Sequence, residues 1–246
     1  MSSDRVYPWS NKFDKALVRA RYRFAKRVVK TLASSKTVLN ILDVGTGYGV
    51  GLQEILNRGV RIVAIDIDEK CIKYVYNNLD STVLDVAVCD AMLLPFRPRL
   101  FHAVLIMDVI EHVTNPERLL RESCRVTKSS GLLILSTPNK NVVKHNPHHV
   151  REFSVKELVK LIRKTCTCKI IGLFGQVPVN KLLSILSKVL RIDFVAKFVK
   201  LLPNYETCNI EDFLSENELV NLLACEVYRC GIIRDFAHVV AVVLVS

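Results

Sequence analysis

The chain has 246 residues, half of them hydrophobic, and a net charge of +11 at neutral pH. A chain of this length and apolar content buries a sizeable core, so we expect one α/β domain. It contains no run of 18 uncharged apolar residues and no secretory apolar segment near its N-terminus, so we expect a cytoplasmic protein without a transmembrane helix.

The first predicted element is a helix over residues 11–33, within an N-terminal extension that we place at residues 1–37. Two stripes of residues, one apolar and one basic, follow its length at spacings of three and four. The apolar stripe consists of Phe13, Leu17, Ala20, Phe24 and Val28, and the basic stripe of Lys12, Lys15, Arg19, Arg23, Lys26 and Lys30. We expect one face to pack on the domain. The cations then form either a solvated face or a surface that attracts an anionic substrate or membrane.

A glycine-rich turn follows a predicted buried strand that starts at residue 41. The order is strand, turn, helix, second strand and then an acidic residue, which is typical of a nucleotide-type cofactor site. Glycines at 45, 47 and 49 let the backbone turn tightly and approach a ligand closely. Asp66 lies 21 residues after Gly45, where a carboxylate can accept hydrogen bonds from both ribose hydroxyls.

The spacing of this turn distinguishes it from a dinucleotide site. A dinucleotide fingerprint reads G-x-G-x-x-G, because a pyrophosphate rests on the helix N-terminus. Here the turn reads G-x-G-x-G-x-G, and Asp43 stands two places before the first glycine. A carboxylate there opposes a pyrophosphate and suits a ligand with a cationic amine. The segment resembles the first motif, D-x-G-x-G-x-G, of the class I S-adenosylmethionine-dependent methyltransferases.

Further segments extend this resemblance over residues 38–175. A third apolar run ends in D-A at residues 90–91, and a fourth strand, over residues 101–107, precedes D-V-I-E-H-V. The segments N-P-E-R-L-L-R-E, R-V-x-K-S-S-G and S-T-P-N follow in that order. Together they are similar to the subgroup that includes the ubiquinone-pathway O- and C-methyltransferases.

The resemblance implies a doubly wound, mostly parallel α/β sheet of seven strands, the Rossmann-like methyltransferase fold, with an antiparallel last strand. It also implies S-adenosylmethionine in the crevice at the carboxyl ends of strands one, two and four. In the family, the acidic residue at position 90 contacts the adenine amino group. The implied cofactor-binding residues are Asp43, Gly45, Thr46, Gly47, Gly49, Asp66, Ile67, Asp90, Ala91, Met107 and Asp108. We expect Asp68 to cap the helix that follows it.

A long insertion separates the last two strands. In the family these strands form a hairpin, but here residues 176–235 lie before the final core strand at 236–246. An insertion of about sixty residues is too long for a hairpin loop, so it needs structure of its own. Its apolar residues with basic margins predict two short helices, joined near Asp193 and ended by Pro203. A lid over an apolar acceptor, a membrane-surface helix and plain packing remain open.

Histidines after the fourth and fifth strands are candidates for chemistry. His112, in E-H-V, lies at the cofactor's reactive end in this fold, and we choose it as the candidate base, with structural hydrogen bonding as the alternative. Asp108, Glu111, His112 and His148 resemble the metal ligands of small-RNA terminal 2′-O-methyltransferases. Aspartate replaces a glutamate of that set, however, and E-H-V also occurs in relatives without a metal, so we predict no metal site.

The eight cysteines include no C-x-x-C pair. We expect reduced and largely buried thiols. Cys166 and Cys168 stay open as a metal or redox pair.

These features predict a methyltransferase that moves a methyl group by in-line displacement to a small-molecule or lipid-like acceptor. The charge is uneven, because residues 1–40 and 151–200 each carry +8 while residues 41–150 are neutral. RNA methylation through these basic flanks, at a ribose 2′-hydroxyl for example, is the alternative. Against it, no aromatic residues are interleaved with the cations. A non-catalytic scaffold would not need the intact glycine motif with Asp66 and Asp90. We expect at most weak, non-specific contact with nucleic acid or an anionic surface, and leave the oligomeric state open.

Overall fold

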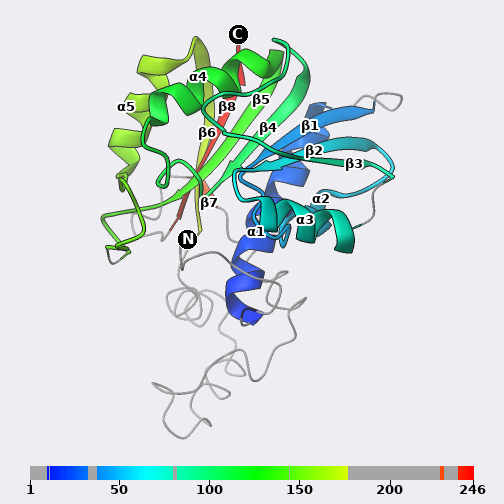
Figure 1. The fold of residues 1–246 in the computed structure, drawn as a ribbon. Helices are drawn as coiled ribbons and strands as arrows, with labels where there is room; N and C mark the ends of the chain where they lie inside the picture. The colour runs from blue at the N-terminus through cyan, green and yellow to red at the C-terminus, as the bar shows by residue number, and fades with distance from the viewer. Residues whose placement is uncertain are drawn as a thin grey trace, which may run out of the picture.

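The structure, a computed structural model, describes residues 10, 12–32, 38–79, 82–143, 145–176, 228–229 and 238–246. Its centre is one sheet with the strand order β3-β2-β1-β4-β5-β8-β6-β7 (Figure 1). The strands are β1 (Leu39–Val44), β2 (Val60–Asp66), β3 (Leu84–Val88), β4 (Phe101–Met107), β5 (Thr127–Pro138), β6 (Cys168–Gln176), β7 (Tyr228–Arg229) and β8 (His238–Val245). The helices are α1 (Lys12–Val29), a 3₁₀ turn (Lys30–Leu32), α2 (Leu52–Ile55), α3 (Glu69–Asn78), α4 (Pro116–Val126) and α5 (Val155–Thr165).

The sheet is parallel from β3 through β5, and β8 then runs antiparallel between β5 and β6. This arrangement confirms the predicted doubly wound sheet with an antiparallel last strand. Strand β7 adds two residues at the edge of β6 and was not predicted. It falls within residues 176–235. The rest of that insertion, with the helices predicted around Asp193 and Pro203, lies outside the described residues, and the division of the chain at residues 37 and 175 stays a prediction.

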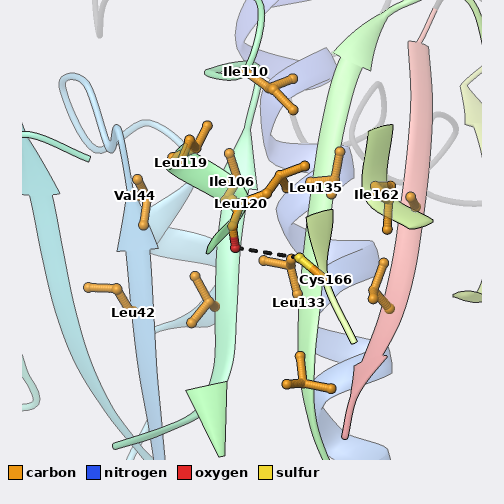
Figure 2. Packing of buried hydrophobic residues seen from close by; sticks show 14 of the residues in the cluster. Leu42, Val44, Ile106, Ile110, Leu119, Leu120, Leu133, Leu135, Ile162 and Cys166 are labelled. Atoms are coloured by element: carbon orange, nitrogen blue, oxygen red, sulfur yellow. Dashed lines mark hydrogen bonds between the residues drawn. The ribbon is translucent and has the colours of Figure 1, made fainter. Parts of the chain in front are cut away.

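Helices cover both faces of the sheet. On one face, α4 and α5 pack on side chains from β1, β4, β5 and β8, as Figure 2 shows for Leu119 and Ile162. On the other, α1, α2 and α3 pack on the alternate side chains of the same strands. Because β1 is covered on both faces, its sequence reads as a nearly continuous apolar run.

The described thiols are structural. Cys71 and Cys166 are buried, and Cys89, Cys124 and Cys168 are partly buried; all five are free cysteines. The Cys166 thiol donates to the carbonyl oxygen of Leu120 at 3.6 Å and so fastens α5 to α4 (Figure 2).

Local capping fixes where the helices begin. Asp68 accepts a hydrogen bond from the backbone N–H of Lys70 and caps α3, as predicted. Asn115 caps α4 with Pro116 in the first turn, and Ser154 and Glu157 form a capping box on α5. Among the described helices, none has the length and apolar content needed to cross a membrane.

Helix α1 lies at residues 12–29, within the predicted range, but its two stripes behave differently from the prediction. The buried face includes Arg21 and Tyr22, each about 3% exposed, beside Ala20 and Phe24. The prediction of an outward basic stripe was wrong for two members. Arg19 and Arg23 both pair with Glu54 on α2, at 2.6 and 2.8 Å, and Glu54 is itself buried.

The two ion pairs on Glu54 give a stability prediction. Glu54→Gln should lower the free energy of unfolding by about 2 kcal/mol, because it leaves two partly buried guanidinium groups without their counter-charge. Urea denaturation measures this difference. The control is Glu69→Gln, whose pair with Lys73 is largely exposed and should contribute little. Equal effects of the two substitutions would show that α1 is not held by these pairs.

Candidate functional site

A cavity of about 910 Å³ lies at the carboxyl ends of β1, β2 and β4. It is lined from α1, from the glycine turn after β1, and from the segments that follow β2, β3, β4 and β5. Nine of the residues implied as cofactor-binding line it: Gly45, Thr46, Gly47, Asp66, Ile67, Asp90, Ala91, Met107 and Asp108. Asp43 and Gly49 do not line it. The predicted residues therefore converge on one space, with those two placed behind it.

The glycine turn presents bare backbone to the cavity. Gly45, Gly47 and Gly49 all have positive φ values, of 71°, 55° and 72°. At Gly47 a Cβ atom would meet nothing within 4 Å, so the missing side chain leaves open space at the wall of the cavity. The requirement for glycine at Gly51 is different, because a Cβ there would lie 2.1 Å from the ring of Tyr22. Gly51 thus makes room for a residue of α1.

Asp66 is held in place by the turn. Its Oδ2 atom accepts the backbone N–H of Gly47 at 2.8 Å, and its Oδ1 atom accepts that of Asp68 at 2.9 Å. The side chain is only 5% exposed, and it lines the cavity beside the exposed Ile67. The two contacts fix the orientation of the carboxylate, so a diol such as ribose would meet a preorganised acceptor.

Asp43 forms a buried layer behind the cavity. It is fully buried, and the Tyr22 hydroxyl donates to its carboxylate, at 2.9 and 3.0 Å from the two oxygens. Burial raises the pKa of Asp43 to about 6, against the lowering effect of the Tyr22 hydroxyl. Burial and the nearby carboxylate raise the pKa of Tyr22 well above its usual value, so the phenol keeps its proton.

Asp108 organises the opposite end of the cavity. It follows β4 with a φ of 54°, and the Ser136 hydroxyl donates to its Oδ1 atom at 2.7 Å. Arg21 of α1 forms an ion pair with its Oδ2 atom and donates to Gln176 at 2.6 Å. The Nε2 atom of His238 lies 3.8 Å from the same carboxylate. Helix α1 is thereby joined to β4, β5, β6 and β8 around one acidic side chain.

Charge is nearly balanced in this region. Burial alone would raise the pKa of Asp108, but Arg21, His238 and Ser136 outweigh it and lower that pKa. Burial and the Asp108 charge raise the pKa of Glu111 well above its usual value. Burial and Arg21 lower the pKa of His238 to about 4, so its imidazole is neutral near pH 7. The far end is thus close to neutral.

Glu111 and two histidines form a compact cluster on the same wall. Glu111, His112 and His149 each place a ligand-type atom within 4.8 Å of the other two. His148, which the sequence suggested for this set, lines the cavity but enters the cluster through its backbone carbonyl oxygen, which faces Nδ1 of His112 at 3.3 Å. Residues in a turn follow no fixed period, so the sequence offered no reason to choose residue 149 over residue 148 as the member of this cluster.

Some residues of the site were not found from the sequence. Arg21, Tyr22, Ser136, Gln176 and His238 are far apart in the chain and meet only in the fold. Four buried side-chain atoms among the cavity residues also have no partner within the described structure. Thr46 Oγ1 belongs to the glycine turn, and the other three, Arg21 Nε, Glu111 Oε1 and His238 Nδ1, lie toward Asp108. Unpaired buried polar atoms are costly, and their gathering at one end of a cavity is typical of a site for a polar ligand.

Residues 42–135 match the protein family described as a methyltransferase domain, of type 11. The chain is 31% identical over 147 residues to a probable S-adenosylmethionine-dependent methyltransferase of Mycobacterium tuberculosis, covering 57% of this chain and 53% of that protein. It is also 31% identical over 115 residues to a ubiquinone biosynthesis O-methyltransferase of Nitrosomonas europaea, covering 44% of this chain and 46% of the relative. The chain therefore spans about half the length of the curated relatives it matches.

Solved structures agree on the fold. A possible histamine N-methyltransferase of Thermotoga maritima superposes with a TM-score of 0.59 at 18% identity, covering 94% of this chain and 91% of that one. The cyclase SpnF superposes equally well, with a TM-score of 0.59 at 16% identity, covering 91% and 81%. These likenesses establish the fold alone, because the same fold also carries the name of a cyclase.

The raised pKa of Asp43 predicts a pH-dependent cost to stability. The folded protein holds the carboxyl proton more tightly than the unfolded chain does, so this contribution to stability is fully present below about pH 4 and is lost as pH rises through about 6. Asp43→Asn imitates the protonated form. It should match the wild type near pH 4 and be more stable by about 2–3 kcal/mol at pH 8.

Thermal or urea unfolding across pH 4–8 measures the Asp43→Asn effect. The matched control is Asp85→Asn on β3, a strand-borne carboxyl that is exposed and should show no such divergence. Parallel stability curves for wild type and Asp43→Asn would contradict the assignment.

Proposed function

We propose, from the premise that this chain belongs to the class I S-adenosylmethionine-dependent methyltransferases of type 11, that it transfers a methyl group to a small-molecule or lipid-like acceptor. The observation that carries this proposal is the single cavity. Its one end is the glycine turn with Asp66 and Asp90, and its other end holds Asp108, His112 and His238. A donor and an acceptor placed at these two ends would meet inside one cavity.

The residues at the donor end fit the family's cofactor. Gly47 leaves backbone open to the cavity, and the Asp66 carboxylate, which lines it, is held in orientation by two backbone N–H groups. Asp90 lines the cavity, and its Oδ1 atom accepts the N–H of Met92 at 2.8 Å, which orients the carboxylate after β3. We assign ribose binding to Asp66 and the adenine end to Asp90 and Ala91.

Methyl transfer requires little of the protein beyond alignment of the two reactants. When bound, the cofactor supplies a methyl group on a sulfonium, which an aligned nucleophile displaces in line. Holding the two reactants in a near-attack geometry supplies much of the rate. Here α1 carries out part of that task, because Arg21 and Tyr22 close one side of the cavity and contact Asp108 and Asp43.

A hydroxyl acceptor must also lose a proton. The Nδ1 atom of His112 faces the carbonyl oxygen of His148, which can only accept, so Nδ1 carries the hydrogen and Nε2 the lone pair. With no cation bound, Nε2 of His112 can therefore take the acceptor's proton, which is the role of base that we propose for it.

Two observations favour a small or lipid-like acceptor over RNA. The far end of the cavity is close to neutral, as described above, whereas phosphate recognition needs an excess of cations. Two arginines of the basic stripe are also bound to Glu54 inside the fold. The second basic segment, at residues 151–200, lies partly outside the described residues.

Cofactor affinity tests the donor end. Asp66→Ala should weaken binding of S-adenosylmethionine by at least about 1.5 kcal/mol, because two hydrogen bonds to a charged acceptor are lost. Titration calorimetry measures the change, and NAD should not bind. Asp68→Ser is the matched control, because serine retains the cap on α3 and residue 68 does not line the cavity. Unchanged affinity in Asp66→Ala would overturn the assignment of the ribose site.

Transfer of labelled methyl groups tests the reaction itself. Labelled cofactor is supplied with separate lipid, small-molecule and RNA pools from the source cell. We expect label in the lipid or small-molecule pool and none with Asp66→Ala. Label at one defined position of an RNA would reject the favoured acceptor class, and no label in any pool would favour a non-catalytic role.

A further inference from the structure

We propose that Glu111, His112 and His149 form a binding site for one divalent transition-metal cation, at the acceptor end of the cavity. All three residues line that cavity, and their ligand atoms lie within 4.8 Å of one another. Ligands bound to one such ion at about 2.1 Å are at most about 4.2 Å apart, so only a small side-chain adjustment is needed.

Glu111 supplies the strongest evidence for a cation site. The residue is only 1% exposed, and its Oε2 atom accepts the Thr137 hydroxyl at 3.0 Å. Its Oε1 atom is buried and has no hydrogen-bond partner within the described structure. A buried carboxylate oxygen left unpaired costs free energy, and a cation at this oxygen would remove that cost.

The two histidines are oriented for the same task. The Nδ1 atom of His149 faces Oε1 of Glu152 at 3.3 Å, and the Nδ1 atom of His112 faces the carbonyl oxygen of His148 at the same distance. Both partners are hydrogen-bond acceptors, so each ring carries its hydrogen on Nδ1 and its lone pair on Nε2. Metal-binding histidines typically donate their second ring nitrogen to a carboxylate or a carbonyl in this way.

Surrounding contacts strengthen the position of His149. Glu152 also accepts the backbone N–H of Asn146 at 2.8 Å, which fixes the carboxylate beneath the ring. The Asn146 amide nitrogen lies 3.3 Å from Nε2 of His149, and this contact has to be released when Nε2 binds a cation. The rings of His112 and His149 meet edge to face, with centroids 5.0 Å apart. Each of the three ligands thus has its second polar atom engaged elsewhere.

The donor set indicates the kind of cation. Two imidazoles and one carboxylate suit Mn²⁺, Fe²⁺, Co²⁺ or Zn²⁺, whereas Mg²⁺ prefers oxygen ligands. Asp108 is not part of the set, because Arg21 and Ser136 occupy its two oxygens. Three protein ligands leave coordination positions for water or substrate. The site therefore favours an acceptor that offers an oxygen atom.

The chemical role rests on the proposed methyl transfer. A cation bound to the acceptor hydroxyl lowers its pKa, and the proton leaves to solvent. The resulting oxygen forms a bond to the methyl carbon as the carbon–sulfur bond breaks, and the electron pair of that bond goes to sulfur as a neutral thioether. In this arrangement His112 holds the cation and does not itself take the proton.

Metal binding is tested without reference to activity. Protein freed of metal by chelation is titrated with Mn²⁺ and followed by electron paramagnetic resonance, and Co²⁺ is added separately to record the visible spectrum of nitrogen ligation. We expect one saturable site, with Mg²⁺ a weaker competitor. Glu111→Gln and His149→Ala should each weaken Mn²⁺ binding at least about tenfold. His148→Ala should bind as the wild type does, because residue 148 contributes only a backbone carbonyl.

Circular dichroism establishes that each variant is folded, and the retained affinity of His148→Ala guards against general damage to this loop. Absence of saturable binding in the wild type overturns the site, and so does wild-type affinity in His149→Ala or lost affinity in His148→Ala. The transfer assay, run with and without added Mn²⁺, separates the two proposals. Metal binding without transfer to any pool would leave the site standing and remove the methyltransferase, while undiminished transfer by chelated protein would leave the methyltransferase standing and overturn the cation's part in the reaction.

Discussion

Burial of acidic groups at one edge of the sheet is the constraint on which the rest of this structure depends. Parallel pairing brings the ends of β1, β2 and β4 together, and each end carries an aspartate: Asp43, Asp66 and Asp108. Burial raises the pKa of Asp43, and the neighbouring charge of Asp66 adds to that increase. The fold therefore has to supply a separate partner for each carboxylate.

Helix α1 supplies most of these partners. Tyr22 donates to Asp43, Arg21 pairs with Asp108, and Arg19 and Arg23 pair with Glu54 beside the glycine turn. Asp66 is satisfied instead by backbone N–H groups of the turn and of the start of α3. The N-terminal segment, which carries a net charge of +8 in the sequence, thus uses several of its cations to pair with acidic side chains inside the fold. Its basic character is in good part a requirement of the fold and does not by itself indicate an external partner.

The parts predicted from sequence are those set by local patterns. Apolar runs, the glycine spacing and the cap at Asp68 depend on neighbouring residues, and the sheet and the donor end followed from them. Tyr22 and Arg21 lay next to the predicted apolar stripe, but nothing local says that they bury against residues more than twenty positions away. The histidine cluster was assigned to His148 because turn residues have no fixed period, whereas the fold selects His149.

The central claim is that one cavity, closed by α1, holds the cofactor at the glycine turn. An experimental structure with S-adenosylhomocysteine bound tests it most directly. The account predicts ribose on Asp66, adenine beside Asp90, the sulfur directed toward Asp108, and the contacts of Arg21 and Tyr22 retained. A ligand bound outside this cavity, or a helix α1 displaced from Asp43 and Asp108, would contradict it.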